Sequence, residues 1–488
     1  MIGLSTAAEV RAAEAPLLDS LPDGALMQRA ATGLATVCLR LLGSSYGRHV
    51  ALLVGAGNNG GDALFAGAHL AGRGARVTAV LLDPERAHPG GLAALRRAGG
   101  RALPADADGV ATAVGRADLV LDGILGIGGS GGLRPAAAAL ARLATESAAV
   151  TVAVDVPSGV DADTGAVDGA AFAAMHTITF GAVKPGLVVG EGRGSAGQVH
   201  LVDIGLQPPP ASAFLLTDAD VAARLEPPSA GDDKYSQGVV GIVAGSATYP
   251  GAGVLCTGAA LRTRPGLVRY AGTAADGVRA AWPEAIVTAG RPADAGRVQA
   301  WVVGPGMGTD DDARSVLAEV LATDLPVLAD ADALTMLARE QDLVSGRSAP
   351  TLLTPHDREF ERFGQAVGTD RIGAARRLAA RLRCSILLKG DATVVAGPDG
   401  RAFVNGTGTP WLATAGTGDV LSGIAGSLLA TGLDATEAGA VAAHLHGRTG
   451  QLAAERGPLL AGDLVRRLPD AVGRVRGLGA PGLGDSGA

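Results

Sequence analysis

Short apolar segments alternate along this chain with glycine-rich loops and helical segments. The first clear unit has an apolar segment at 49–54, a loop rich in glycine, asparagine and aspartate at 55–63, and a helical segment through Leu70. Similar apolar segments follow at 76–82, 117–122 and 151–155. Strands that alternate with helices pair in parallel, because each helix returns the chain to the same end of the sheet. The pattern therefore predicts an α/β fold with parallel sheets.

The length and composition indicate more than one such domain. The chain has 488 residues, 47% of them hydrophobic but only 3% aromatic, and 74 are glycine. This Ala/Val/Leu/Gly composition suits buried parallel strands, and the length suits two or three domains. Proline clusters at 207–210 and 226–231 mark the best boundary. We expect a domain at 1–210, a proline-rich linker at 211–230, a second domain at 231–475 and a disordered tail at 476–488.

Charge and cysteine usage exclude several classes of protein. The net charge is −7 and no run of Lys or Arg stands out, which argues against nucleic acid or an acidic membrane surface as a partner. Cys38, Cys256 and Cys384 lie far apart in apolar surroundings and fit no metal-binding spacing. No signal peptide pattern and no uncharged apolar run of membrane-spanning length is visible. We expect a soluble cytoplasmic protein with buried, reduced thiols.

Three strands of the first half end in polar side chains. Asn58-Asn-Gly-Gly-Asp62 follows the first strand, Asp122 ends the second before a glycine-rich loop, and Asp155 ends the third. Ligands of open α/β sheets bind at the carboxyl ends of strands, so these groups should face one crevice. Asn59, Asp122 and Ser158 can supply oxygen ligands for a weakly bound monovalent cation, which leaves Asp155 as the candidate acid or base.

Two alternatives stay open in this half. The Asn58–Asp62 segment can be an ordinary polar turn with Asn in left-handed conformations. Lys184 can approach an anion or cap its turn, and the sequence does not decide between them.

In the second half, the segment 411–423 contains Gly416-Thr-Gly-Asp419 and continues into an apolar helix expected to begin at Asp419. A loop of small residues at a helix N-terminus makes an anion hole from backbone N–H groups and the helix dipole. A carboxylate beside it suits phosphoryl transfer, in which a neighbouring hydroxyl must lose its proton. The alternative is that Asp419 is an ordinary N-cap. No Walker A pattern occurs, so any phosphate should be bound at 416–419.

Other strand ends of the second half carry weaker signals. Asp330 and Asp332 can bind a metal or polar ligand, but capping of the following helix is the favoured interpretation. Lys389, followed by Gly390 and Thr393, suits nucleotide phosphates, although a lone strand-end Lys is often only solvated. His356, at the start of a helix, can hydrogen-bond a ligand as a neutral imidazole.

With these motifs in place, the chain resembles a two-domain family of nicotinamide nucleotide repair proteins from roughly Ser5 to Arg474. The first half resembles NAD(P)H-hydrate epimerases and the second the ADP-dependent NAD(P)H-hydrate dehydratases. The matching motifs are 58–62, 155–161, 184–186, 234–238, 353–356, 405–408 and 413–421. The resemblance implies a Rossmann-like three-layer α/β/α domain followed by a ribokinase-like α/β domain.

The resemblance also implies a set of site residues. Asp155 and Asp419 would be catalytic. The hydrated nicotinamide in the epimerase half would contact Asn58, Asn59, Gly60, Gly61, Asp62, Gly126, Ile127, Gly128, Gly129, Ser130, Gly131, Gly132 and Asp155. Potassium would bind Asn59, Asp122 and Ser158. The dehydratase substrate would contact Ala252, Gly253, Gly306, His356 and Asp419. The nucleotide would contact Lys389, Gly390, Asp391, Ala392, Thr393, Gly416, Thr417 and Gly418.

The activity implied is repair of hydrated NADH and NADPH. One half would interconvert the R and S hydrates, and the other would dehydrate the S epimer with ADP and Mg²⁺, releasing AMP and phosphate. Asp357-Arg358 replaces the family's usual Pro-Gly after Pro355-His356, and Trp411 is bulkier than expected. A kinase of a vitamin-like alcohol fused to a non-catalytic nucleotide-binding module is the alternative. NAD(P)H hydrates and ADP are the expected partners, and we expect a homo-oligomer.

Overall fold

The computed structural model describes residues 1–129, 131–264 and 266–477, and the chain divides into two compact units. One unit spans Gly3–Ala213, and the other contains Met1–Ile2 and the chain from Phe214 onward. The segment 211–230, expected as a linker, contains β9 (Ala213–Leu215) and α8 (Asp218–Ala222), so part of it is regular structure. Most of the expected tail, 478–488, lies outside the described residues.

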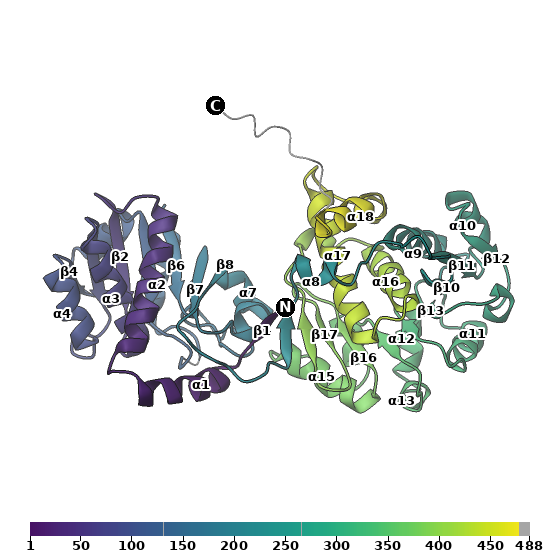
Figure 1. Cartoon of the computed structure of the whole chain (residues 1–488), viewed down its shortest axis with the longest axis horizontal. Helices are drawn as coiled ribbons and strands as arrows, with labels where there is room; N and C mark the ends of the chain where they lie inside the picture. The colour runs from purple at the N-terminus through teal and green to yellow at the C-terminus, as the bar shows by residue number, and fades with distance from the viewer. Residues whose placement is uncertain (130, 265, 478–488) are drawn as a thin grey trace. The chain divides into compact units, whose positions relative to one another are not determined.

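The N-terminal unit contains a seven-stranded sheet with the order β4-β3-β2-β5-β6-β7-β8 (Figure 1). Its strands are β2 (His49–Val54), β3 (Arg76–Leu81), β4 (Arg101–Pro104), β5 (Leu119–Gly123), β6 (Val150–Val154), β7 (His176–Phe180) and β8 (Gln198–Val202). Each neighbouring pair is parallel. The parallel sheet predicted from the alternating pattern is therefore confirmed.

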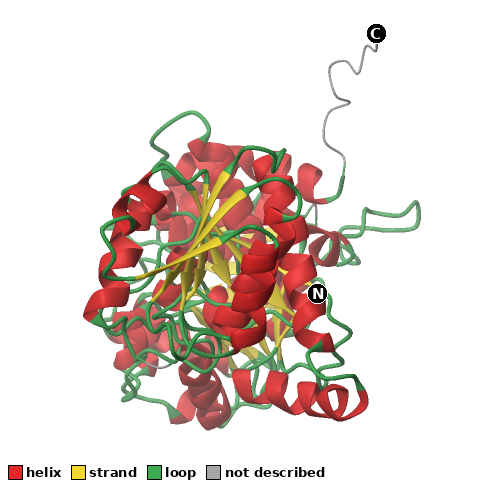
Figure 2. Ribbon diagram, turned by 90° about the vertical axis from the view of Figure 1, so that its left-hand side faces the viewer, coloured by secondary structure: helices red, strands yellow, loops and turns green. Residues whose placement is uncertain are grey.

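Helices cover both faces of this sheet, as Figure 2 shows. They are α1 (Ala7–Ser20), α2 (Ala25–Leu42), α3 (Asn58–Ala71), α4 (Pro89–Arg97), α5 (Val110–Gly115), α6 (Pro135–Thr145) and α7 (Gly190–Ala196). Along β2, Val50, Leu52 and Val54 pack in one apolar cluster with residues of α2 and α3. Ala51 and Leu53 pack in another with residues of α5 and α6. Because successive strand residues face opposite sides, one strand serves two cores and the unit has three layers.

The second unit contains an eleven-stranded sheet with the order β1-β9-β18-β17-β16-β15-β14-β13-β10-β11-β12. Its remaining strands are β1 (Ile2–Leu4), β10 (Val239–Val243), β11 (Leu267–Ala271), β12 (Ile286–Thr288), β13 (Ala300–Val303), β14 (Val327–Ala329), β15 (Thr351–Leu353), β16 (Ser385–Leu388), β17 (Val394–Ala396) and β18 (Ala402–Val404). The strands from β12 to β16 pair in parallel. The pairs β16–β17 and β17–β18 are antiparallel, an extension common on otherwise parallel sheets.

Helix α16 (Thr417–Ala430) is buried along most of its length and is central to this unit. It packs against α9 (Pro250–Thr263), α17 (Ala435–Ala454) and α18 (Ala461–Val475). The close approach of α16 to α9 and to β13 depends on two glycines, which have no side chain in the way. A Cβ on Gly423 would lie 2.2 Å from the Cys256 carbonyl oxygen of α9, and one on Gly426 would lie 2.1 Å from Val302 Cγ2 of β13. This packing fixes the position of the loop that precedes α16.

The other helices of the second unit are shorter than α16. They are α10 (Ala275–Ala281), α11 (Asp311–Leu321), α12 (Asp332–Leu337), α13 (Asp342–Ser345), α14 (Asp357–Glu361) and α15 (Arg371–Leu382). None of the helices in the described residues has both the length and the apolar character that crossing a membrane requires. The three cysteines are free and buried, as the sequence predicts.

Gly423→Ala should destabilise the second unit by about 1–3 kcal/mol, because the added methyl group meets backbone of α9 that cannot move independently. Gly473→Ala is the matched control, since a Cβ at this position of α18 meets nothing within 4 Å. It should be neutral or stabilising by up to about 1 kcal/mol. Urea unfolding of the full chain measures both, and equal effects would contradict this account of the α16–α9 packing.

Candidate active sites

The N-terminal unit has a cavity of about 1250 Å³ lined by residues from the carboxyl ends of β2, β5 and β6. These three strands are neighbours in the sheet, and residues from all three ends share one crevice as expected, except that Asp122 itself is buried and does not line it. Eight of the predicted site residues line it: Asn58, Asn59, Asp62, Gly126, Ile127, Gly128, Gly129 and Asp155. Residues of α1 and α2, including Arg11 and Glu14, form the opposite part of its lining.

Other predicted residues serve backbone packing and do not line the cavity. A Cβ on Gly60 would lie 2.3 Å from the Gly55 carbonyl oxygen, and one on Gly132 would lie 2.0 Å from the Asp168 carbonyl oxygen. Gly61 packs against the His88 ring, and Gly131 adopts a left-handed conformation with φ 72°. Ser130 lies outside the described residues.

The segment Asn58–Asp62 forms the first turn of α3, and Gly57 precedes it with φ 96°. The alternative of a polar turn with left-handed asparagines is therefore wrong. The glycine takes the unusual backbone conformation, because it has no Cβ to oppose it. Asn58, Asn59 and Asp62 consequently project from a helix N-terminus, where polar and anionic groups are favoured by the helix dipole.

Asp155 is held by a buried lysine. Its backbone has φ 65°, which is unusual for a residue other than glycine. Asp155 Oδ1 accepts hydrogen bonds from Lys184 Nζ at 2.6 Å, Thr179 Oγ1 at 3.1 Å and the Phe180 backbone N–H at 3.3 Å. Lys184 is 1% exposed, and its Nζ also donates to the Phe180 carbonyl oxygen at 3.0 Å. The two interpretations left open for Lys184 therefore each describe one of its contacts, since the ammonium binds the Asp155 carboxylate and a backbone carbonyl at its own turn.

Two further carboxyl groups share this cavity with Asp155. Burial, followed by the charges of Asp155 and Glu14, raises the pKa of Asp62 well above its usual value. Burial and then Asp155 also raise the pKa of Glu14. Glu14 belongs to no recognisable motif, so the sequence analysis missed it; only the fold of α1 brings it to the cavity. The result is a cavity with one lysine-paired carboxylate and two carboxyl groups that favour protonation.

A second group of oxygen atoms surrounds Asp122, which is fully buried. Ser158 Oγ donates to Asp122 Oδ1 at 2.7 Å, and the Ser158 backbone N–H donates to Oδ2 at 2.8 Å. Asn59 Nδ2 donates to the Leu125 carbonyl oxygen at 2.9 Å, which also lies 3.2 Å from Ser158 Oγ. Burial raises the pKa of Asp122 to about 6. In the described ranges no Lys or Arg pairs with this carboxylate, so the three predicted ligands lie together around an uncompensated buried charge.

In the second unit, helix α16 begins at Thr417 and not at Asp419 as expected. Gly416 is its N-cap with φ 87°, so Asp419 lies inside the first turn and the N-cap alternative for it is wrong. The Thr417 hydroxyl donates to the carbonyl oxygens of Leu412 and Thr414 at 2.8 and 2.9 Å and so closes the loop. The Thr417 backbone N–H donates to the Thr414 carbonyl oxygen at 3.3 Å, whereas those of Gly418 and Asp419 have no partner among the described residues and are left to bind an anion.

Burial, followed by the charge of Asp330, raises the pKa of Asp419 to about 6, and Lys389 partly opposes this. Asp330 was expected to cap α12, and this prediction is wrong. The N-cap of α12 is Ala331, and no side chain makes a capping hydrogen bond there. Asp330 Oδ1 instead accepts a hydrogen bond from Lys389 Nζ at 2.6 Å. Asp332 accepts a hydrogen bond from the Gly308 backbone N–H at 2.9 Å.

The structure gathers the remaining predicted residues of this unit into two groups. A Cβ on Gly306 would lie 3.0 Å from Ala252 Cβ, which places these residues and Gly253 together. A Cβ on Gly418 would lie 3.5 Å from Lys389 Nζ, which joins the segments 389–393 and 416–418. His356 is the N-cap of α14, and its ring is half exposed. Trp411 is 47% exposed on the loop before α16.

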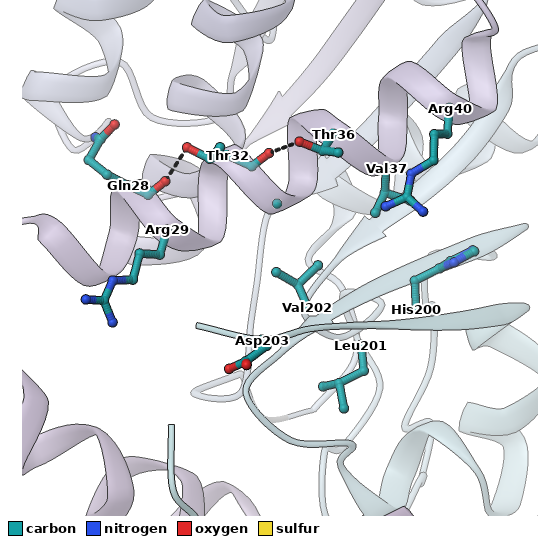
Figure 3. A pocket seen from close by; sticks show the side chains of 11 residues that line it. Gln28, Arg29, Thr32, Thr36, Val37, Arg40, His200, Leu201, Val202 and Asp203 are labelled. Atoms are coloured by element: carbon teal, nitrogen blue, oxygen red, sulfur yellow. Dashed lines mark hydrogen bonds between the residues drawn. The ribbon is translucent and has the colours of Figure 1, made fainter. Parts of the chain in front are cut away.

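A further hollow of about 760 Å³ lies between α2 and β8 (Figure 3). The hydroxyl groups of Thr32 and Thr36 donate to the carbonyl oxygens of Gln28 and Thr32 within α2. Asp203 accepts from the Gly205 backbone N–H. The two threonine hydroxyl groups and this carboxylate thus already bind backbone, and none of the predicted site residues lines this hollow.

Comparisons with known proteins assign both halves. A model described as YjeF-related protein N-terminus matches residues 23–186, and one described as NAD(P)H-hydrate dehydratase matches 240–470. The bifunctional NAD(P)H-hydrate repair enzyme Nnr of Mycobacterium leprae is 52% identical over 475 residues, covering 96% of this chain and 97% of that protein. The chain belongs to the bifunctional NAD(P)H-hydrate repair enzyme family.

A second curated relative and a solved structure are also similar to this chain. The Nnr protein of Mycobacterium tuberculosis is 54% identical over 436 residues, covering 88% of this chain and 90% of that protein. A solved ADP/ATP-dependent NAD(P)H-hydrate dehydratase from Bacillus subtilis, co-crystallised with ATP and Mg²⁺, is 30% identical. It covers 53% of this chain and 97% of its own, with a TM-score of 0.48. The two matched ranges of this repair enzyme chain include all the predicted site residues.

Asp357, one of the two departures from the family pattern, has a clear structural role in this chain. It pairs with both terminal nitrogens of Arg371 at 3.0 and 2.9 Å, and Arg371 Nη2 also donates to the Lys389 carbonyl oxygen at 2.8 Å. A bidentate pair of this kind fixes the guanidinium orientation. Asp357 therefore supports the strand end that carries Lys389.

Lys184→Met should destabilise the N-terminal unit by about 3–5 kcal/mol, because it leaves the Asp155 carboxylate buried without its partner. Arg48→Met breaks a 2.8 Å pair with Asp118 that is exposed, and should cost less than about 1 kcal/mol. Lys184→Met combined with Asp155→Leu should recover part of the loss. Denaturant unfolding measures all three variants, and equal losses for the two single variants would contradict the importance of burial.

Proposed function

We propose that this chain repairs hydrated NADH and NADPH, with epimerisation in the unit 3–213 and nucleotide-dependent dehydration in the unit from 214 to 475. Family membership supports the pair of activities, and the placement of Asp419 in the first turn of α16 supports the dehydration chemistry most directly. A carboxylate and a set of free helix N-terminal amides adjoin there, as a phosphoryl transfer to a hydroxyl group requires.

In the dehydration reaction the substrate carries a hydroxyl group on carbon 6 of its reduced nicotinamide ring. Asp419 takes the proton of this hydroxyl, and the hydroxyl oxygen then forms a bond to the β-phosphorus of ADP. The bond from that phosphorus to the bridging oxygen breaks, so AMP leaves with that oxygen. The amides at the start of α16 and the Lys389 ammonium stabilise the charge on the phosphoryl group. Phosphate is a far better leaving group than hydroxide.

The ring nitrogen then supplies the electron pair that expels phosphate from carbon 6. Loss of a proton from carbon 5 restores the ring double bond and gives NADH or NADPH. Lys389, Gly390, Asp391, Ala392, Thr393, Gly416, Thr417 and Gly418 form the proposed nucleotide site. Ala252, Gly253, Gly306 and His356 form the proposed site for the S hydrate.

Mg²⁺ is proposed to enter this site with the nucleotide. In the part of the chain that the structure describes, His, Cys, Asp and Glu residues form no group of three or more able to hold a metal ion. Mg²⁺ typically keeps several waters and binds substrate phosphates with few protein ligands, which fits this observation. The ion supplies charge neutralisation of the phosphates when it is bound.

In the epimerase unit, Asp155 is the proposed proton carrier for the interconversion of the R and S hydrates. The Lys184 ammonium keeps it in a fixed orientation with Oδ1 occupied. Its second oxygen, Oδ2, forms no hydrogen bond with the described residues and is free to reach a ligand in the cavity. Asn58, Asn59, Asp62 and the loop 126–129 provide the polar lining that would bind the hydrated ring.

Potassium is proposed as the ion of the epimerase unit. Asn59, Asp122 and Ser158 would hold it, with the Leu125 carbonyl oxygen beside them. The uncompensated buried carboxylate of Asp122 supports this proposal, because a cation would offset its burial. The ion would tie together the ends of α3, β5 and the loop after β6. We also propose a cytoplasmic location, supported by the three buried free thiols.

Replacing Asp419 by Asn should abolish ADP-dependent dehydration and leave epimerisation intact, because Asn cannot accept the hydroxyl proton. Asp155→Asn should have the converse effect. The near-ultraviolet absorbance of reduced nicotinamide, recovered from hydrated NADH with ADP, measures dehydration, and chromatographic separation of the two epimers measures exchange. Near wild-type dehydration by Asp419→Asn would rule out this assignment. A stable phosphorylated product would favour the kinase alternative.

Potassium should raise the melting temperature of the N-terminal unit by roughly 2–8 °C over choline at equal ionic strength, because binding to the folded state alone stabilises it. Asp122→Asn should remove this dependence. Asp118→Asn, at a partly exposed residue close in sequence, should retain it. Thermal unfolding at fixed ionic strength gives the readout, and an equal response of Asp122→Asn and wild type would exclude the proposed ligands.

A further inference from the structure

Asp330 lies at the centre of a buried network in the dehydratase unit. It directly follows β14 and is 2% exposed. Its Oδ1 accepts hydrogen bonds from Lys389 Nζ at 2.6 Å and from the Ala331 backbone N–H at 2.9 Å. Its Oδ2 accepts from Ser422 Oγ at 2.7 Å, which comes from the second turn of α16. The carboxylate therefore joins the ends of β14 and β16, which have β15 between them in the sheet, to the helix that carries Asp419.

The network sets the position of the Lys389 ammonium. The Lys389 side chain is 21% exposed, so it reaches the accessible side of the site, and its Nζ lies 3.5 Å from where a Gly418 Cβ would stand. Its backbone is held independently, because the Lys389 carbonyl oxygen accepts from Arg371. Burial lowers the pKa of Lys389, but the Asp330 carboxylate raises it, and the pKa is raised overall. The ammonium therefore stays charged. A lysine fixed at both ends is preorganised, whereas a free one would lose side-chain entropy on binding phosphate.

The same carboxylate acts on Asp419 through its charge. The Asp330 carboxylate disfavours the ionised form of Asp419, and the Lys389 ammonium favours it. Asp332 of α12 adds a smaller repulsion. Glu359 of α14 acts on Lys389. Cys256 of α9 also interacts with Asp419, but burial raises the pKa of this thiol well above its usual value, so it is neutral.

His446 of α17 faces Lys389 and is neutral as well, because burial lowers its pKa to about 4. Asp330 and Lys389 are therefore the two charged groups that dominate the surroundings of Asp419. The arrangement has a chemical consequence for a proton acceptor. If Lys389 were not engaged by Asp330, its ammonium would be free to pair with Asp419 and would weaken it as a base.

We propose that Asp330 is a positioning residue for the dehydration reaction: it holds the Lys389 ammonium beside the first turn of α16 for the phosphoryl group and keeps it from pairing with Asp419. Ser422 holds the second oxygen of Asp330 and so fixes the direction of the carboxylate. The proposal rests on the dehydratase function proposed above and adds to it a residue whose two carboxylate oxygens are both engaged by protein groups.

The test is Asp330→Asn in the full chain, with kcat and the KM for ADP measured for hydrated NADH between about pH 5 and pH 8. In the wild type, activity should fall as the pH drops through about 6, because Asp419 becomes protonated. The variant loses the repulsion from Asp330 and frees Lys389, so the pKa of Asp419 falls. The acidic limb of the pH–activity profile, where activity falls at low pH, should therefore move down by roughly one pH unit or more. The KM for ADP should rise roughly tenfold, as loss of a fixed charged contact predicts.

Three variants separate positioning from simple damage to the fold. Ser422→Ala removes a hydrogen bond to Asp330 but no charge, so its acidic limb should stay at the wild-type pH. Asp330→Glu retains the charge and should keep the limb nearer the wild type than Asp330→Asn. If Asp330→Asn fails to fold, the double variant Lys389→Met with Asp330→Asn leaves no unpaired ammonium. The acidic limb of this double variant should still lie at a lower pH than that of Lys389→Met alone.

The outcomes distinguish this inference from the proposed function. Epimerisation by the other unit normalises each variant preparation for its content of active chain, and thermal unfolding of the full chain checks that the dehydratase unit is folded. A wild type without ADP-dependent dehydration would overturn the proposed function and this inference with it. Normal wild-type dehydration, with an unmoved acidic limb and an unchanged KM for ADP in Asp330→Asn, would overturn the inference alone. A uniform loss of activity at every pH with no shift of the limb would show a merely structural role and would overturn it as well.

Discussion

Parallel pairing of the strands is the constraint on which both proposed sites depend. In a parallel sheet the carboxyl ends of neighbouring strands meet at one edge, so residues far apart in the sequence become neighbours there. Asp122 ends β5 and Asp155 follows β6 in one unit, and Asp330 follows β14 and Lys389 follows β16 in the other. The chain uses this geometry twice, with different partners around each carboxylate.

Both sites pair a buried carboxylate with a buried or half-buried lysine at 2.6 Å. The consequences differ because the partner of the carboxylate differs. Lys184 pairs directly with Asp155, the proposed proton carrier, and fixes its orientation. Lys389 pairs with Asp330, which leaves Asp419 without a direct cationic partner and with a raised pKa. A direct pair fixes the orientation of a carboxylate, whereas an indirect one leaves the neighbouring acid, Asp419, with a pKa raised to about 6.

Several elements of the fold and site follow from local sequence. Val50, Leu52 and Val54 alternate with Ala51 and Leu53, so the buried strand β2 is visible in the sequence, and the glycine loop after it indicates a helix start. Asn59, Asp122 and Ser158 were grouped correctly, because the ends of adjacent parallel strands must adjoin. The start of α16 was misplaced by two residues, and Asp330 was assigned to capping, because a cap and a buried ion pair have the same local sequence.

The amino-acid sequence by itself determined the α/β class, the order of the elements and which polar residues stand at strand ends, since these depend on short-range periodicity and turn chemistry. Only the tertiary structure decided the partners of Asp155 and Asp330, the arrival of Glu14 at the first cavity and the antiparallel addition of β17 and β18. The physical reason is that charge pairing and burial depend on which segments pack together. Lys184 lies 29 residues from Asp155 and Ser422 lies 92 from Asp330, distances over which no local pattern carries information.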